Sequence, residues 1–317
     1  MLRSADVKAK ARELGFDICG IAPATPLPEL RFLGEWIASG YAGSMAYLER
    51  SAGLRADVRR VMPSARVVIV TGTVYNTARP YSTECSDPGR AQIARYGWGD
   101  DYHDIIGRRL EAMVSWMRGV SAAPFEARAY VDTGPVQERV YAQHAGVGWI
   151  GKNTCVIDHA LGSWLFLGEI ICSLPLDVDS PALDQCGDCE LCLEACPTGA
   201  LVGPRVLDAT RCISYWTIEH RGSFAPDAAA AIGSHVYGCD VCQEVCPWNA
   251  AAPVSSDSRW QPRPAWDAVQ LVDLADRSDD ELRRALRGSA MARARVAGLR
   301  RNIAAASHNS GTAELRD

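Results

Sequence analysis

The chain has 317 residues, of which 48% are hydrophobic and 22% are charged, and its formal net charge is −5. This composition is typical of a packed globular protein with room for two domains, and it excludes both a disordered chain and one whose overall charge attracts nucleic acid. No run reaches the roughly 18 apolar residues of a membrane span and no apolar leader opens the chain, so we expect a cytoplasmic protein that contacts no membrane.

The first 175 residues show helix and strand patterns in turn, which predicts an α/β domain. The run 66–75 contains Val-Val-Ile-Val and predicts a strand that is buried on both faces. The expected elements in chain order are a helix over 4–14 that stops at Gly15, a strand over 16–22, helical pieces over 31–49, a polar loop that holds Arg55, the buried strand, a loop over 76–90, an amphipathic helix over 104–118, a short strand over 127–131, a helix over 136–144, and strands over 155–157 and 163–171.

Residues 93–103 form a polar and aromatic segment with a glycine on each side of Trp98. Such a segment is poor core material, so we expect a loop that faces a ligand. In the helix that follows, apolar residues recur at helical spacing, and we expect its methionines to lie in the core.

Asp132 follows the short strand over 127–131 and opens the turn Asp-Thr-Gly-Pro. A carboxylate at the end of a strand is held by a rigid scaffold and is still reachable from a cleft. The alternative is that Asp132 caps the helix expected over 136–144, and the sequence does not decide between the two roles.

Three glycines, Gly146, Gly148 and Gly151, lie in the segment 145–154 and let backbone amides approach a large ligand closely. Their spacing matches G-x-G-x-x-G, but no Val/Ile-rich strand leads into it, so the motif is weak evidence for a dinucleotide. Residues 174–184 hold two prolines and predict a linker, which places a domain boundary near residue 175.

Eight of the twelve cysteines lie between positions 186 and 246. They form the runs Cys186-x2-Cys189-x2-Cys192-x3-Cys196-Pro197 and Cys239-x2-Cys242-x3-Cys246-Pro247, with Cys212 between them. In two-cluster ferredoxins such a run gives three thiolates to one iron–sulfur cluster and the fourth to the other. We therefore predict two [4Fe-4S] clusters, one held by Cys186, Cys189, Cys192 and Cys246, the other by Cys196, Cys212, Cys239 and Cys242.

Two other uses of these cysteines are weaker. Zinc takes four ligands in a closed tetrahedron and has no use for a third closely spaced cysteine or for the Cys-Pro endings. A disulfide framework is expected in short secreted chains, which this is not.

Near the C-terminus, Ser278 and Glu281 form a capping box that opens a helix marked by Leu282, Leu286, Val296 and Leu299. Seven arginines lie between positions 283 and 301. Most such helices present a solvated face, but this one could also lie on phosphates. A polar tail follows over 304–317.

Taken together, the segments 93–103, 130–139 and 145–154 and the double cysteine run closely resemble the epoxyqueuosine reductase family of tRNA-modifying enzymes, over about residues 55–301. The resemblance implies a cobalamin held beside two [4Fe-4S] clusters and fed with single electrons by them. It implies removal of the epoxide oxygen of epoxyqueuosine in tRNA, which gives queuosine. It also implies that Asp132 donates the proton, with a pKa raised by burial beneath the corrin.

The resemblance further implies a set of binding residues. The corrin contacts fall on Arg55, Asp132, Gly148, Lys152, Asn153, Thr154, Val156, Val241 and Cys242. Asp101, His103 and Gly107 look like a D-x-H-x-x-G cobalamin motif, but the glycine comes one residue late. The resemblance implies a cobalt without a protein ligand, and we therefore expect His103 to be structural. Longer family members carry a C-terminal helical-repeat extension that is absent here, which puts the expected tRNA contact on Arg300 and Arg301.

The expected fold class is α+β: an α/β cobalamin-binding domain over 1–175, a ferredoxin-like domain with two [4Fe-4S] clusters over 176–255, and a helical, arginine-rich C-terminal segment over 256–317. The expected partners are tRNA and an external low-potential electron donor, and the protein is expected to be a monomer. Two alternatives stay open. One is a cobalamin-dependent enzyme like the reductive dehalogenases, and the other is a non-catalytic iron–sulfur electron-transfer protein, which would bind no corrin.

Overall fold

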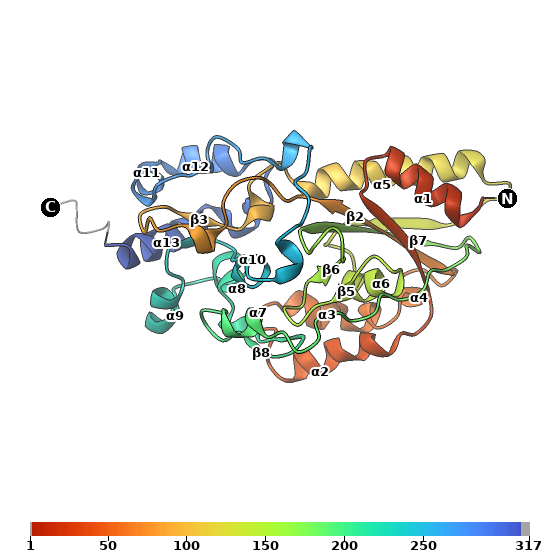
Figure 1. Ribbon diagram of the computed structural model, residues 1–317, viewed down its shortest axis with the longest axis horizontal. Coiled ribbons are helices and arrows are strands. Elements are labelled where there is room, and N and C mark those ends of the chain that lie inside the picture. The colour runs from red at the N-terminus through yellow and green to blue at the C-terminus, as the bar shows by residue number, and fades with distance from the viewer. Residues whose placement is uncertain (1, 312–317) are drawn as a thin grey trace. The chain divides into compact units, whose positions relative to one another are not determined.

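The computed structural model describes residues 2–311, which form two compact units (Figure 1). Unit 1 comprises residues 2–74, 102–189 and 248–253, and unit 2 comprises residues 75–101, 190–247 and 254–311. The sequence suggested three consecutive domains, but the chain passes back and forth between the units. The C-terminal segment and most of the cysteine region belong to the same unit.

The centre of unit 1 is a four-stranded antiparallel sheet. Its order is β1 (Ile18–Pro23), β2 (Val67–Val74), β7 (Leu165–Cys172) and β4 (Ala127–Tyr130). Every residue of β2 is buried, which confirms the strand predicted to be covered on both faces. Its two neighbours run antiparallel to it, so the double burial comes from helices on both sides and not from a parallel sheet.

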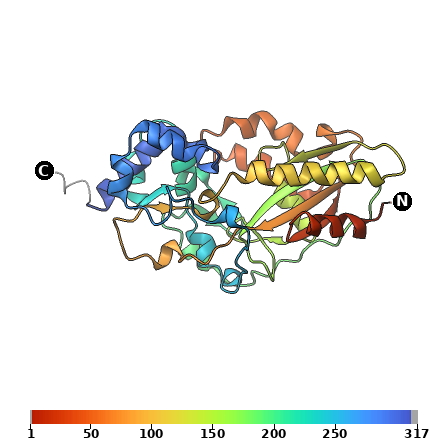
Figure 2. The ribbon, with the colours of Figure 1, turned by 90° about the horizontal axis from the view of Figure 1, so that it is seen from above.

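Helices cover both faces of this sheet (Figures 1 and 2). α5 (Tyr102–Val120) packs on β7 and β4 and lies beside α1 (Ser4–Glu13), which contacts β1. α6 (Glu138–His144) contacts β1, β2 and β7 from the other face. All five apolar residues predicted for the core face of α5 are buried, namely Ile105, Leu110, Met113, Val114 and Met117. Each such side chain contributes about 1.5–3 kcal/mol on burial.

The other elements of unit 1 are short. They are α2 (Phe32–Ala38), α3 (Ala46–Arg55), α4 (Val58–Val61), a 3-10 turn at Pro28–Arg31, and the two-stranded pair β5 (Trp149–Ile150) and β6 (Val156–Ile157). Arg55 is the last residue of α3, so its predicted place in a polar loop is wrong. Gly15 follows α1 with a φ of 86°, as expected of a helix stop.

Unit 2 contains two small sheets and several short helices. β3 (Gln92–Ile93) pairs in parallel with β10 (His235–Tyr237), and β8 (Leu201–Gly203) pairs with β9 (Val206–Leu207). The helices are α7 (Leu191–Glu194), α8 (Ile213–Ile218), α9 (Pro226–Ala231), α10 (Val241–Glu244), α11 (Leu271–Asp276), α12 (Asp279–Leu286) and α13 (Arg295–Asn309), with 3-10 turns at Ser82–Glu84, Arg95–Gly97, Ala209–Arg211, Pro247–Asn249, Ser258–Trp260 and Ala290–Ala294.

The segment 93–103 is largely interior, so the prediction that it is poor core material is wrong. Ile93, Ala94 and Arg95 are all buried. The Arg95 guanidinium donates to the backbone oxygens of Thr77 and Arg79 at 2.9 and 3.0 Å, which compensates for its burial. The pairing of β3 with β10 is what draws this stretch into unit 2.

At the C-terminal end, the Ser278–Glu281 capping box is confirmed: the Ser278 amide donates to the Glu281 carboxylate over 2.7 Å. The single long helix expected after it is wrong, because α12 ends at Leu286 and α13 begins at Arg295. The expected polar tail is helical as far as Asn309, and its residues 312–317 lie outside the described residues. None of the helices over residues 2–311 has the length and apolar character that crossing a membrane requires.

Candidate active site

Asp132 lies on the loop between β4 and α6, and its backbone is left-handed, with a φ of 56°. Aspartate tolerates this region better than most residues. The surrounding turn is tight, since the Thr133 amide is 2.5 Å from the Val131 carbonyl oxygen. A Cβ on Gly134 would come within 2.5 Å of the Tyr130 side chain. These constraints hold the Asp132 carboxylate at the end of the strand.

The capping role considered for Asp132 is wrong. α6 begins only at Glu138, with Gln137 as its N-cap residue. Asp132 therefore comes six positions before the helix, and its side chain is available for another function.

The N-terminal end of α5 supplies the partners of Asp132. The Tyr102 hydroxyl donates to a carboxylate oxygen over 3.1 Å, and Nε2 of His103 is 3.4 Å from the same oxygen. The Tyr102 ring stacks on Phe166 of β7, with the centroids 4.4 Å apart and the planes 3° from parallel. His103 is thus placed as a partner of Asp132.

The pKa of Asp132 is lowered, not raised, in the polypeptide alone. Burial by neighbouring atoms favours the neutral acid, but the hydrogen bonds from His103 and Tyr102 and the charge of Arg139 favour the carboxylate and outweigh it. The Asp132 side chain is 59% exposed, so desolvation is incomplete. The raised pKa expected from the sequence requires a further group that covers this carboxylate.

Two glutamates that the sequence analysis missed lie near Asp132. Glu138 opens α6, and Glu169 lies in β7, where its side chain is hydrogen-bonded to that of Glu138. Burial raises the pKa of Glu138 to about 7 and raises that of Glu169 well above its usual value. The signal was present in the sequence, because Glu169 is the one charged residue in the otherwise apolar run 165–172.

The predicted corrin-binding loop, residues 148–156, is tied to this region by Arg139, whose guanidinium donates to the Thr154 carbonyl over 2.8 Å. Thr154 has a φ of 69°, and the Asn153 side chain accepts from the Cys155 amide. A Cβ on Gly148 would lie 2.5 Å from the Ile157 carbonyl oxygen. Close packing of β5 on β6 therefore explains this glycine without a ligand.

Arg55 also belongs to this region. Its guanidinium donates to the Val136 carbonyl over 2.7 Å, and its charge acts on Glu138. The structure thus gathers Arg55, Asp132 and the loop around the start of α6. Val241 and Cys242, the other predicted corrin contacts, lie in the first turn of α10 in unit 2.

Within unit 2, three of the predicted cluster cysteines interact. The charges of Cys212 and Cys196 both act to raise the pKa of Cys239, adding to the larger effect of its burial. The thiol of Cys196 accepts a hydrogen bond from the Ala200 amide over 3.3 Å. The described residues contain no preformed group of three or more metal-binding side chains. All twelve cysteines are free of disulfides.

The predicted tRNA contacts Arg300 and Arg301 have partners inside unit 2. Arg300 pairs with Asp279 over 2.9 Å, and the Arg301 guanidinium donates to the Trp216 carbonyl over 2.8 Å. Arg301 also lies 4.1 Å from the centroid of the Phe224 ring, and burial lowers its pKa to about 10. Both arginines therefore stabilise the fold in addition to any role on tRNA.

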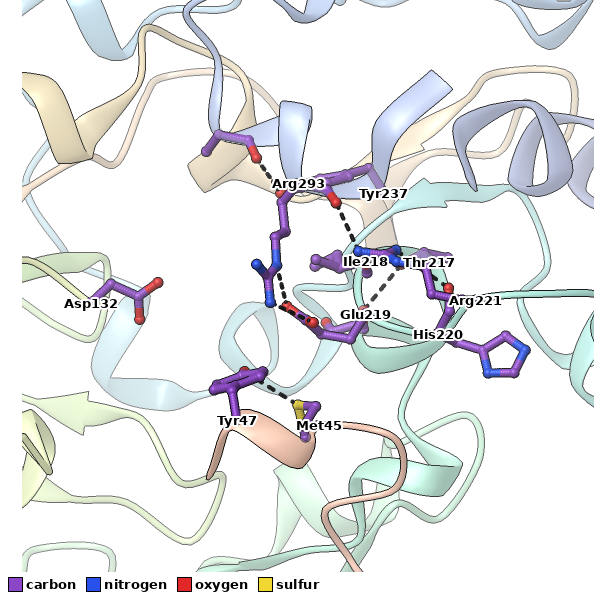
Figure 3. A network of polar contacts seen from close by, with 12 residues as sticks. Met45, Tyr47, Asp132, Thr217, Ile218, Glu219, His220, Arg221, Tyr237 and Arg293 are labelled. Atoms are coloured by element: carbon purple, nitrogen blue, oxygen red, sulfur yellow. Dashed lines mark hydrogen bonds and ion pairs between the residues drawn. The ribbon is translucent and has the colours of Figure 1, made fainter. Parts of the chain in front are cut away.

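A second group of arginines lies in the same unit (Figure 3). Arg293 forms a two-pronged ion pair with Glu219, with both N–O distances 2.8 Å. The Arg221 guanidinium donates to the Arg293 carbonyl, and the charges of Arg295 and Arg293 act on it. Arg295 is exposed.

Comparison with known proteins identifies the family. Residues 55–133 match the model described as "Epoxyqueuosine reductase QueG, DUF1730", and residues 185–249 match the 4Fe-4S double cluster binding domain. The chain is 44% identical to the epoxyqueuosine reductase of Gloeobacter violaceus over 97% of both chains. It is 38% identical to that of Xanthomonas campestris, over 98% of this chain and 88% of the relative.

Solved structures agree. A crystal structure of epoxyqueuosine reductase with an epoxyqueuosine-modified tRNA stem loop is 28% identical and superposes with a TM-score of 0.85, covering 98% of this chain and 82% of that one. The Bacillus subtilis enzyme, with its aspartate-bearing catalytic loop swung out of the active site, matches at 26% identity with the same TM-score and coverage. The mixed α/β architecture is thus shared with these structures, and the chain belongs to the epoxyqueuosine reductase family.

Proposed function

We propose that this protein reduces the epoxide of epoxyqueuosine in tRNA, giving queuosine. The observation that carries the proposal is the 44% identity to an epoxyqueuosine reductase over nearly the whole of both chains. The reaction removes one oxygen atom as water and therefore consumes two electrons and two protons. The iron–sulfur region supplies a route for the electrons, and acidic side chains must supply the protons.

We assign the two [4Fe-4S] clusters to the eight cysteines of the two runs. One cluster takes Cys186, Cys189, Cys192 and Cys246, and the other takes Cys196, Cys212, Cys239 and Cys242. The donor set fits, because thiolates are the usual ligands of such clusters. The electrostatic coupling of Cys196, Cys212 and Cys239 supports the second set. An amide that donates to Cys196 sulfur suits a cluster ligand, since N–H···S bonds stabilise the thiolate.

We further propose cobalamin as the cofactor at the Asp132 site. The rim of a corrin carries amide groups, and the side chains of Arg55, Asp132 and Lys152 offer matching donors and acceptors. The other contacts in this proposal are Gly148, Asn153, Thr154, Val156, Val241 and Cys242. When bound, the cobalt centre would supply the reduction of the epoxide carbon.

Asp132 is the proton donor in this proposal. Its loop position, its exposed carboxylate and its contacts with Tyr102 and His103 place an acid where a ligand can reach it. A ligand that covers the carboxylate removes water from it and raises its pKa, which lets it act as an acid. The B. subtilis relative, which has an aspartate-bearing catalytic loop at its active site, supports this role.

The partners in this proposal are tRNA and an external low-potential electron donor, with the protein acting as a cytoplasmic monomer. Arg300 and Arg301 remain proposed tRNA contacts. The exposed Arg295 and its neighbours Arg221 and Arg293 add further positive charge in unit 2.

The test is nucleoside analysis by mass spectrometry after anaerobic incubation of the reconstituted protein with cobalamin, a low-potential reductant and epoxyqueuosine-containing tRNA. We expect queuosine to appear, and we expect Asp132→Asn to keep both clusters and cobalamin but to lose turnover. An Asp132→Asn enzyme with full activity would remove this residue from the mechanism. A protein that binds iron but no cobalamin would instead be an electron carrier.

A further inference from the structure

Two carboxyl side chains in unit 1 have no assigned role. Glu169 lies in the middle of β7 and is 1% exposed, and its Oε1 atom is buried with no hydrogen-bond partner in the described chain. In the sheet register it is opposite Tyr130, two residues before Asp132. A buried carboxyl group that is incompletely bonded costs stability, so its presence in an apolar strand needs a reason.

The partner of Glu169 is another acid. Leu167 and Ile171, which alternate with Glu169 along β7, pack in the core that also contains Val140 and Tyr141 of α6. The Glu169 side chain therefore faces α6, where it is hydrogen-bonded to Glu138 at the start of that helix. Two carboxylates cannot hydrogen-bond to each other unless a proton lies between them.

The surroundings keep that proton on the pair at neutral pH. Asp132 adds negative charge that favours protonation of both glutamates, and the positive charges of Arg139 and Arg55 oppose it only in part. The pKa of Glu138 is about 7, whereas that of Asp132 lies below 3.8. The proton is therefore held by the pair in preference to Asp132.

The proposed reaction needs a group that stores a proton near Asp132. Formation of water from the epoxide oxygen takes two protons, and a single aspartate carries at most one. Moreover, Asp132 is anionic in the uncovered site, because His103 and Tyr102 stabilise its carboxylate. Under the proposed function, this aspartate must receive a proton before each transfer, and Glu138 and Glu169 are the buried acids whose pKa values its charge helps to raise.

We propose that Glu138 and Glu169 hold one proton between them and pass it to Asp132 during turnover. This role rests on the proposed function, in which Asp132 is the acid. The O–H bond on the glutamate pair breaks and an O–H bond forms on the Asp132 carboxylate as a ligand covers it. The pair is left with one more negative charge and takes a proton from solvent to reset. No electrons move in this step. The two glutamates are positioning residues that act through Asp132.

The test is the pH profile of the single-turnover rate, measured on the holoenzyme with both clusters, cobalamin and an epoxyqueuosine-containing tRNA stem loop. In the wild type we expect a rate that is flat below about pH 7 and falls above it, as the pair loses its proton. In Glu169→Gln, the amide donates to Glu138 and leaves it anionic, so solvent must protonate Asp132. We expect its rate to rise about tenfold for each pH unit that the pH falls, and to lie at least about 10-fold below wild type near pH 8.

The matched control is Glu111→Gln, an exposed glutamate on α5, whose profile should follow the wild type. If Glu169→Gln gives the wild-type profile, or the same shape at a uniformly lower rate, the proton-storing role is overturned. Should that variant fail to fold, Glu138→Gln tests the same exchange from the other side. Infrared difference spectra of the wild type give a reading without any variant, because a protonated carboxyl band must disappear near pH 7.

The two proposals fail differently. If Asp132→Asn turns over normally, Asp132 is not the acid and the proposed mechanism falls. If Asp132→Asn is inactive while Glu169→Gln follows the wild-type profile, only the role of the pair falls. A wild-type protein without a protonated carboxyl band at about pH 6 also overturns the pair's role.

Discussion

Tyr102→Phe isolates one contribution to the acidity of Asp132. The substitution removes the hydroxyl that donates to the carboxylate over 3.1 Å and leaves the ring, which stacks on Phe166 at 4.4 Å. A hydrogen bond to a charged group contributes about 1.5–3 kcal/mol. Because Asp132 is 59% exposed, solvent screening reduces this to about 1 kcal/mol. Since about 1.36 kcal/mol corresponds to one pKa unit, the pKa of Asp132 should rise by about 0.7.

The sign of the stability effect follows from the same contact. Asp132 has a folded pKa below its usual 3.8, so its stabilising effect is present above that value and is lost as the pH falls through the folded pKa. Tyr102→Phe should therefore lower the free energy of unfolding by up to about 1 kcal/mol near neutral pH and leave it unchanged in strong acid.

The assay is carbon-detected NMR of the Asp132 side-chain carboxyl across an acid titration. Tyr130→Phe is the matched control, since it removes a hydroxyl from the strand before Asp132 and keeps the ring against which Gly134 packs. Its titration should match the wild type. An unchanged pKa of Asp132 in Tyr102→Phe, or a lowered one, would refute the claim that this hydroxyl stabilises the carboxylate.

Three further predictions concern stability. Gly148→Ala should lower the free energy of unfolding, measured by thermal melts, by about 1–3 kcal/mol, because its Cβ would meet the Ile157 carbonyl oxygen at 2.5 Å. The control is Gly107→Ala, whose Cβ meets nothing within 4 Å and which should show no loss in these melts. Arg301→Ala removes donors to three backbone carbonyls and should cost about 2–3 kcal/mol in urea unfolding, so a loss of tRNA binding counts only if the variant is folded at the assay temperature. The pKa of Glu138 is raised from 4.5 to about 7, so its stabilising effect is fully present below pH 4.5 and is lost as the pH rises through 7. This effect is at most about 3 kcal/mol. Glu138→Gln should flatten the dependence of the free energy of unfolding on pH between those values, and an unchanged slope would contradict the raised pKa.

Local patterns predicted several elements of both units well, because each depends on a nearby signal. The β-branched run at 67–74, the helix face on α5 and the capping box at Ser278 are all recorded in a few consecutive residues. The cysteine spacing likewise identified the double-cluster region that the family comparison supports.

The errors came from contacts between distant segments. Residues 93–103 look like an exposed loop, yet Ile93 pairs with Tyr237 and Arg95 satisfies its charge on carbonyls of the segment 77–79. The Glu138–Glu169 contact joins a helix start to a strand 31 positions later, and no local pattern connects them. Contacts between polar side chains of distant segments leave no periodic pattern in the sequence, so periodicity cannot predict them.

The division of the chain restricts how this protein can be cut. Residues 248–253 return to unit 1 directly after the last cysteine, and Asn249 accepts from the Ser163 amide over 2.7 Å while its own amide donates to the Ser163 hydroxyl. A gene fragment that ends before residue 248 would encode unit 1 without the two buried hydrogen bonds between Asn249 and Ser163. Chimaeras between relatives therefore have to exchange the N-terminal segments of unit 1 together with residues 248–253. For the same reason, a protease that cleaves one loop should not release either unit as an independent module.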